Sequence, residues 1–216
     1  MANTLITIAR QLGSGGSRIG LEISKKLGFR YFDREIVRQA AAMLKDGEDI
    51  FTAREEKLSG FFENLIRPFI LGSPEAAYMP PPLHPVYDRD IFDAESGIIR
   101  QIAAKYNAVI VGRGGGHVLK GQPGLVNVFI HAPLEFRVKR IMEFYKISDE
   151  KDASELAAKS DHDRAKYIRM MTGQDWTDLR NYHLCLDSER AGFEASQEMV
   201  CRIVDEVRKK PGAARK

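Results

Sequence analysis

Cysteine is scarce: the chain has 216 residues but only two cysteines, Cys185 and Cys201. Two cysteines are too few for the disulfide framework of a small secreted domain. Histidine, cysteine and acidic residues also do not group at the spacing of a zinc site. We therefore expect both cysteines to be buried, reduced thiols in a cytoplasmic protein.

Long hydrophobic runs are missing as well. The longest apolar region, Phe61 to Gly72, is interrupted by Glu63, Arg67 and Pro68, whereas a helix that spans a bilayer needs about 20 apolar residues. The first residues show no basic segment followed by a long apolar stretch, so we expect no signal peptide. The charges nearly balance, with 33 basic and 30 acidic side chains and a net charge of +3. We expect neither a membrane nor a nucleic acid as a partner.

Short apolar segments alternate with amphipathic ones along most of the chain, which is the pattern of an α/β domain. Residues 4–8, "TLITI", predict a buried parallel strand. Ile19, Ile23 and Leu27 then recur at helical spacing before Gly28, a helix-ending residue. Further strands are expected at 29–33, 108–111, 125–132 and 182–188, and further helices at 34–44, 88–105, 133–144, 146–169 and 193–209. The sequence thus predicts one domain, residues 1–208, built on a parallel sheet, with a disordered tail at 209–216.

Residues 45–88 break this alternation. They contain a predicted helix and then a loop with Pro74, Pro80, Pro81, Pro82 and Pro85. Long irregular loops are uncommon inside compact domains. We therefore predict that residues 45–88 are an insertion carried on the α/β core.

A glycine-rich segment, "ARQLGSGGSRIG", follows the first predicted strand. A loop that binds phosphate needs a strand to aim it, glycines to expose backbone N–H groups, and a helix N-terminus to add its dipole. Gly13, Gly15 and Gly16 supply the glycines, and Ser17 supplies a hydroxyl for Mg²⁺. The alternative is an ordinary glycine turn, but three glycines in four residues make a backbone that is costly to order.

The same loop lacks a lysine. In a phosphate-binding loop of the form G-x-x-x-x-G-K-[ST], counting back from Ser17 puts Gly16 at the lysine and Arg10 at the first glycine. Arg10 and Arg18 flank the loop and are candidates to replace the missing cation. We favour Arg10, because the residue after a strand in an α/β fold faces the ligand crevice. Arg18 lies past Ser17 in the first turn of the predicted helix.

Five blocks of sequence resemble the cytidylate kinase-like family, a P-loop group related to the nucleoside monophosphate kinases. The blocks are "ITIARQLGSGGSRIG", "LGFRYFDREIVRQAA", "VIVGRGGGHVL", "KSDHDRAKY" and "LCLDSERAGFEASQEMVCRIVDEV". They follow the family's order over nearly the whole chain apart from residues 45–88. The resemblance implies a three-layer α/β P-loop kinase fold with a five-stranded parallel sheet, an acceptor-side insertion at 45–88 and a lid at 146–169.

The resemblance also implies roles for single residues. The nucleotide phosphates would lie on the loop residues Gly13, Ser14, Gly15, Gly16 and Ser17, with the Ser17 hydroxyl on Mg²⁺. The acceptor would be bound by Asp33, Arg113 and Asp163. The phosphate in transfer would be neutralised by Lys159, Arg164 and Lys166, together with Arg10 or Arg18.

Some of these positions depart from the family pattern or have simpler interpretations. Gly114 replaces the aspartate that would follow Arg113, and lysine replaces arginine at 159 and 166, which keeps charge but loses the bidentate fork. From the residues alone, Asp33 also suits a helix N-cap. Asp161, Asp163 and Arg164 also suit a solvated helix face.

The function implied by the resemblance is transfer of the γ-phosphate of Mg·ATP to a small acceptor, most simply CMP or dCMP. Two alternatives stay open. The glycine at 16 favours a nucleotide-binding module without turnover, and Gly114 with the insertion favours a kinase for a different small acceptor. Each alternative keeps small-molecule nucleotides as the ligands.

Overall fold

The computed structural model describes residues 3–33 and 89–209. The predicted helix at 34–44, the insertion at 45–88 and the tail from residue 210 lie outside the described residues. Within the described part, no helix is long and apolar enough to cross a membrane.

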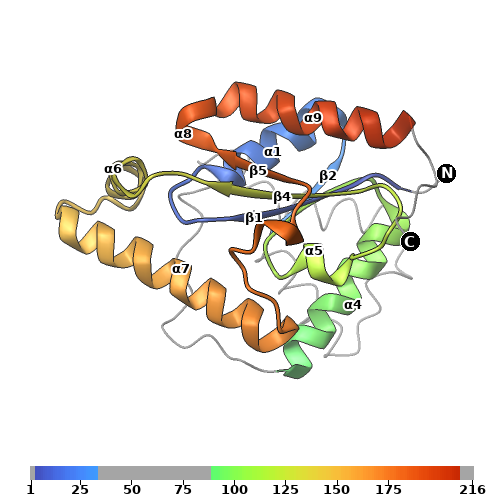
Figure 1. Cartoon of the computed structure of the whole chain (residues 1–216), viewed down its shortest axis with the longest axis horizontal. Coiled ribbons are helices and arrows are strands. Elements are labelled where there is room, and N and C mark those ends of the chain that lie inside the picture. Colours follow the sequence, from blue (N-terminus) through green and yellow to red (C-terminus); the bar gives the residue numbers. More distant parts are fainter. Residues whose placement is uncertain (1–2, 34–88, 210–216) are drawn as a thin grey trace.

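The centre of the domain is a parallel sheet of five strands (Figure 1). The strands are β1 (Leu5–Arg10), β2 (Arg30–Phe32), β3 (Ala108–Val111), β4 (Leu125–His131) and β5 (Leu184–Asp187), in the spatial order β2-β3-β1-β4-β5. Every neighbouring pair is parallel. β-Branched and other apolar residues fill the central strands, which are buried on both faces, as such sheets require. The predicted five-stranded parallel sheet is confirmed.

Helices cover both faces of the sheet, so the domain has three layers (Figure 1). Helices α1 (Gly16–Leu27) and α9 (Phe193–Lys209) pack on one face, and α4 (Arg89–Lys105) and the short α5 (Gly115–Val118) lie on the other. Helices α6 (Leu134–Tyr145) and α7 (Glu150–Thr172) pack against each other beside the sheet. Two short elements, η1 (Leu179–Asn181) and α8 (Ser188–Ala191), flank β5.

The strand order brings two glycine-rich turns together. β3 and β4 lie on either side of β1, so the strand order reverses around β1, and ligands of open α/β sheets bind in the crevice at such a point. Ile8 pairs with Val111, and the Gly112 N–H donates to the Ile8 carbonyl at 2.9 Å. The turns after β1 and β3 therefore leave the same edge of the sheet side by side.

The observed elements differ from the predicted ones mainly at their ends. β1 continues to Arg10, beyond the predicted end at residue 8, because the strand keeps its register with β4 up to the Arg10–Ile130 pair. α7 begins at Glu150, where Asp149 caps the helix by accepting from the Asp152 N–H at 3.0 Å. The sequence did not predict α5, η1 and α8, which have four, three and four residues.

The cysteines only partly match the expectation. Both thiols are free, and Cys201 is buried while Cys185 is half-buried near the edge of the sheet. Burial raises the pKa of both thiols. Both cysteines therefore stay protonated and weakly nucleophilic at neutral pH.

Candidate functional site

The turn between β1 and α1 requires its glycines. Gly13 and Gly15 have φ values of 82° and 80°, in the left-handed region that L side chains rarely adopt. Gly13 also lies against the backbone of α6, because a Cβ there would sit 2.7 Å from the Arg137 carbonyl oxygen. Gly15 is the N-cap of α1, so the backbone N–H groups of the first helical turn face the end of the sheet.

The buried side chain of Ser14 stabilises this turn through hydrogen bonds. Its hydroxyl is fully buried and lies 2.9 Å from the Gln11 carbonyl oxygen and 3.2 Å from that of Ile130. The Ser188 hydroxyl donates to the Ser14 carbonyl at 2.6 Å. The side chain of Ser14 therefore fixes the shape of the loop, and contact with phosphate would come from its neighbours.

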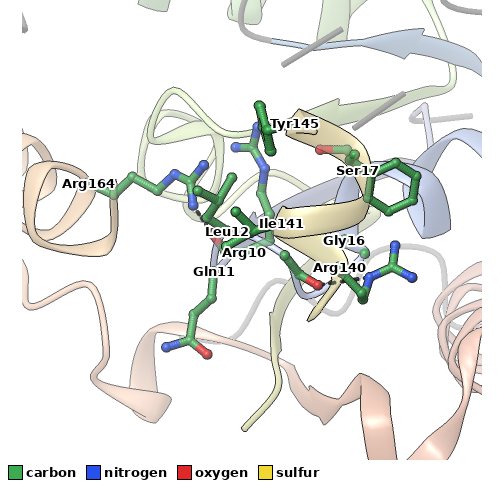
Figure 2. A pocket seen from close by; sticks show the side chains of 12 residues that line it. Arg10, Gln11, Leu12, Gly16, Ser17, Arg140, Ile141, Tyr145 and Arg164 are labelled. Atoms are coloured by element: carbon green, nitrogen blue, oxygen red, sulfur yellow. Dashed lines mark hydrogen bonds between the residues drawn. The ribbon is translucent and has the colours of Figure 1, made fainter. Parts of the chain in front are cut away.

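A pocket lies over the loop and contains about 350 Å³ of empty space, part of it open to solvent (Figure 2). One wall is the loop itself, from Arg10 to Ser17. The opposite wall is the second half of α6, with Arg140 and Phe144, and Arg164 of α7 closes one side. Polar N–H groups, a hydroxyl and three guanidinium groups in one cavity are suited to an anionic ligand.

Three arginines of the α6–α7 pair bind the loop backbone. Arg140 Nε donates to the Gly13 carbonyl at 3.0 Å, and Arg164 Nη1 donates to the Arg10 carbonyl at 3.0 Å, as Figure 2 shows. Arg137 Nη1 donates to the Leu12 carbonyl at 3.2 Å. The two helices α6 and α7 thus help to fix the backbone conformation of the loop.

Asp161 of α7 also helps to fix this conformation. Its carboxylate accepts from Arg137 Nη1 at 2.7 Å and from the Leu12 N–H at 3.1 Å. Both side chains of the ion pair are largely buried, 8% and 16% exposed. Asp161 therefore binds the loop directly, so it is not the purely solvated residue that the sequence left as an alternative.

The turn after β3 carries a second charged cluster. Arg113 has a positive φ of 55° and pairs with Glu95, whose side chain on α4 is only 1% exposed. The Arg113 guanidinium lies 4.9 Å from the centroid of the Tyr167 ring on α7, and the Tyr167 hydroxyl lies 3.4 Å from Glu95 Oε2. Glu95 Oε1 and Arg113 Nε are both buried, and neither has a partner among the described residues.

The structure brings some of the predicted site residues together. Arg10, Gly13, Gly15, Gly16, Ser17 and Arg164 line the pocket. Arg113 lies on the neighbouring turn, and the half-buried Asp33 follows β2. Arg18 is exposed, with its guanidinium 5.2 Å from the ring centroid of Phe193.

The remaining predicted residues lie on α7 outside the pocket lining. Lys159 and Lys166 are exposed, and Asp163 is half-buried. Their spacing of four and three residues puts them on one side of the helix. Whether they meet a ligand stays a prediction.

Sequence reasoning missed Arg137, Arg140 and Glu95. Glu95 had a usable signal, because it is a lone carboxylate on a stripe of apolar residues with Phe92, Ile99 and Ile102. The two arginines had none, since basic residues on an amphipathic helix usually face solvent.

The loop offers a magnesium ion one protein ligand, the Ser17 hydroxyl. No group of three or more His, Cys, Asp or Glu side chains in residues 3–33 and 89–209 could hold a metal ion. The donor set at the loop is instead the Ser17 hydroxyl, with room for phosphate oxygens in the pocket. This suits Mg²⁺, which keeps several waters and takes few protein ligands at nucleotide sites.

The sequence is similar to known cytidylate kinases. The description of the family whose model matches residues 5–190 is "Cytidylate kinase-like family". The chain is 30% identical over 131 residues to a cytidylate kinase of Methanoregula boonei, in a match that covers 60% of this chain and 69% of that protein. It is 33% identical over 107 residues to a cytidylate kinase of Methanosarcina acetivorans, covering 49% and 57% of the two chains.

Solved structures share the fold. An uncharacterized protein of Eubacterium ventriosum matches with a TM-score of 0.70 at 20% identity, covering 94% of this chain and 99% of that one. A gluconokinase of Sinorhizobium meliloti matches with a TM-score of 0.53 at 11% identity, covering 96% and 97%. At these identities the likeness shows the fold alone, which is that of the P-loop kinases.

Proposed function

The chain belongs to the cytidylate kinase-like family, and we propose that it transfers the γ-phosphate of Mg·ATP to a small acceptor, most simply CMP or dCMP. The observation that carries this proposal is the pocket between the loop at Gly13–Ser17 and the arginines of α6 and α7, next to the Arg113 turn. Such an arrangement offers one phosphate-binding place for a donor and a second, adjacent one for an acceptor.

On the donor side, the backbone N–H groups at the start of α1 bind the phosphates of ATP, and the helix dipole adds to this attraction. The Ser17 hydroxyl would hold the magnesium ion, which would supply positive charge to neutralise the donor phosphates. Arg140 keeps the Gly13 carbonyl turned toward α6. This bond prevents the carbonyl oxygen from pointing at the phosphates.

On the acceptor side, Arg113 binds the anionic group of the acceptor. Asp33 and Asp163 bind polar groups of the same molecule. In the chemical step, an acceptor oxygen forms a bond to the γ-phosphorus while the bond from that phosphorus to the bridging oxygen breaks. The electron pair of the broken bond leaves with ADP. Little covalent chemistry falls to the protein, so catalysis is mostly positioning and charge neutralisation.

The charge in transfer is neutralised by Arg164, Lys159 and Lys166 of α7. Arg164 already lines the pocket, while the two lysines are exposed in the structure. We infer that residues 146–169 act as a lid whose closure carries the lysines over the phosphates and excludes water.

Two other functions keep specific support. A glycine at position 16 favours a module that binds a nucleotide without turnover. Gly114 favours a different acceptor, because an aspartate that would contact the acceptor in the family is replaced by a residue without a side chain.

A screen for ADP release tests all three functions. Purified protein is incubated with Mg·ATP and each of a set of nucleoside monophosphates and small phosphorylated or hydroxylated metabolites. We expect acceptor-dependent ADP release with CMP or dCMP, abolished by removal of Mg²⁺. Release with another acceptor only would identify a different kinase. Binding of Mg·ATP without release for any acceptor would establish the non-catalytic module.

A further inference from the structure

Arg10 and Gly16 occupy exchanged positions. In a phosphate-binding loop of this spacing, the first position carries glycine and the seventh carries lysine. Here the first position is Arg10 and the seventh is Gly16. The chain thus has one long basic residue and one glycine, as such a loop does, but each stands at the other's position.

The packing explains why the two residues must change together. A Cβ atom on Gly16 would lie 2.6 Å from the Cβ of Arg10 and 3.0 Å from its Cγ. The Cβ of Arg10 is fixed to β1 by the backbone, so it cannot swing away as the end of a side chain would. The stem of Arg10 therefore occupies the space in which a lysine side chain at position 16 would begin.

The charged end of Arg10 lies farther on, against the second glycine turn. A Cβ on Gly112 would overlap Nη1 of Arg10. The side chain is 7% exposed and lines the pocket, and Figure 2 shows it among the loop residues. The guanidinium thus lies between the loop after β1 and the turn after β3 that carries Arg113.

The backbone of Arg10 is held at both sides. It pairs with Ile130 at the end of β4, and its carbonyl accepts from Arg164 Nη1 at 3.0 Å. A side chain that starts from a fixed strand end has less freedom to lose than a lysine on a helix surface. A guanidinium in this place is also charged at every relevant pH and presents a planar fork to phosphate oxygens.

We propose that Arg10 and Gly16 are an exchanged pair, in which Arg10 supplies the cation of the phosphate loop from the strand and places it between donor and acceptor. This inference rests on the proposed function. Arg10 contacts the phosphoryl group as it passes from the donor to the acceptor, whereas a lysine starting from α1 would contact the donor. Loss of Arg10 therefore lowers turnover more than it lowers ATP binding.

The steric half of the proposal is tested by thermal unfolding, which needs no turnover. Gly16→Ala is made in the parent, in Arg10→Ala and in Arg10→Gly. We expect the alanine to lower the unfolding midpoint by about 3–10 °C in the first two backgrounds, since both keep the Cβ at position 10. In Arg10→Gly it costs nothing, because alanine is the better helix former once the clash is gone. An equal cost in all three backgrounds overturns the exchange.

The charge half is tested by turnover, in an ADP-release assay with the acceptor that the parent uses. Arg10→Gly should lower kcat by about 10²–10³-fold, as for loss of a positioned transition-state contact, and should weaken Mg·ATP binding much less. Arg10→Gly with Gly16→Lys should regain at least about tenfold of the loss. The control is Arg202→Ala, which removes an exposed arginine of α9 and should leave kcat unchanged.

The outcomes separate this inference from the proposed function. A folded double variant no more active than Arg10→Gly overturns the cation role of Arg10. If the parent releases no ADP with any acceptor, the proposed function fails. The unfolding midpoints and Mg·ATP binding then test the exchanged pair. Gly16→Lys must strengthen Mg·ATP binding in the Arg10→Gly background and must not strengthen it in the parent.

Discussion

The guanidinium of Arg113 is paired with the buried carboxylate of Glu95, which reaches it from α4. Tyr167 of α7 lies over the same guanidinium, so α4 and α7 both contact the turn after β3. These two contacts fix the position of the Arg113 guanidinium and therefore of its positive charge. The turn needs such support, because Arg113 itself adopts a left-handed backbone conformation.

Replacing Glu95 should therefore affect both stability and acceptor binding. Glu95→Gln leaves Arg113 without its counter-charge in a buried place, which should cost about 3–5 kcal/mol of unfolding free energy. The variant should also raise the KM for the acceptor more than the KM for ATP. Urea unfolding and steady-state kinetics measure the two effects.

The matched control for this prediction is Glu22→Gln. Glu22 pairs with Lys25 at 2.9 Å on the surface of α1, where the side chains are 40% and 50% exposed. Exposed pairs of this kind contribute less than about 0.5 kcal/mol. If Glu95→Gln is as mild as this control and the two KM values change alike, the carboxylate does not position Arg113.

The sequence predicted the order and type of the described elements because each rests on a local signal. The β-branched residues Val109, Ile110 and Val111 are followed by glycine, and α1 stops before Gly28, whose backbone N–H caps the helix. Such patterns determine whether a segment is a strand or a helix. They do not determine where β1 ends, since its last pair with Ile130 depends on β4, which lies more than a hundred residues along the chain.

The site was less predictable than the fold. The glycine loop was found from composition and order, but the partners of its backbone were not. Arg137 and Asp161 bind the loop from α6 and α7, and their pairing across 24 residues follows from how these two helices pack. The close approach of Arg10 to Gly16 depends on how α1 packs against β1, and no spacing rule states where the Cβ of a strand residue meets the first turn of the next helix.

Asp161 and Asp163 should behave differently although they lie two residues apart on α7. Asp161→Asn weakens the buried pair with Arg137 and the contact to the Leu12 N–H, so it should lower the free energy of unfolding by about 2–4 kcal/mol. It should also weaken Mg·ATP binding, since the loop loses a support. Asp163→Asn should leave stability nearly unchanged and raise the KM for the acceptor.

Chemical unfolding, calorimetric ATP binding and kinetics of both variants distinguish these roles. Equal stability of the two variants would mean that the Asp161 contacts contribute little to the loop. An unchanged acceptor KM in Asp163→Asn would remove Asp163 from the acceptor site.

Ser17→Ala tests the donor site with little risk to the fold. The side chain lines the pocket, and alanine is well tolerated in the first turn of a helix. We expect the affinity for an ATP analogue to fall about tenfold or more with Mg²⁺ present, and to change little in EDTA, because only the ion contact is lost. A titration of labelled analogue under both conditions measures this, and equal affinities of parent and variant with Mg²⁺ would show that the hydroxyl does not bind the ion.

Gly15 is unsuitable for the same test. A valine there would be strained at a φ of 80°, and its Cβ would sit 2.5 Å from Cε1 of Phe193. Loss of ATP binding in Gly15→Val would therefore reflect a distorted loop as well as blocked phosphates. Ser17→Ala avoids this ambiguity.

Arg140 and Arg18 provide the last prediction, because both guanidinium groups lie against the Phe193 ring, at 4.6 Å and 5.2 Å from its centroid. Only Arg140 also donates to the Gly13 carbonyl and lines the pocket. A hydrogen bond from a charged donor contributes about 1.5–3 kcal/mol, so Arg140→Ala should weaken Mg·ATP binding by about 10–100-fold. Arg18→Ala removes an exposed cation and should change both ATP binding and kcat less than about threefold. Calorimetry with Mg·ATP and single-turnover kinetics compare the two variants. A large fall in kcat for Arg18→Ala, with Arg10→Gly near the parent, would mean that the cation of the loop comes from α1 and that Arg10 serves only the packing of the strand end.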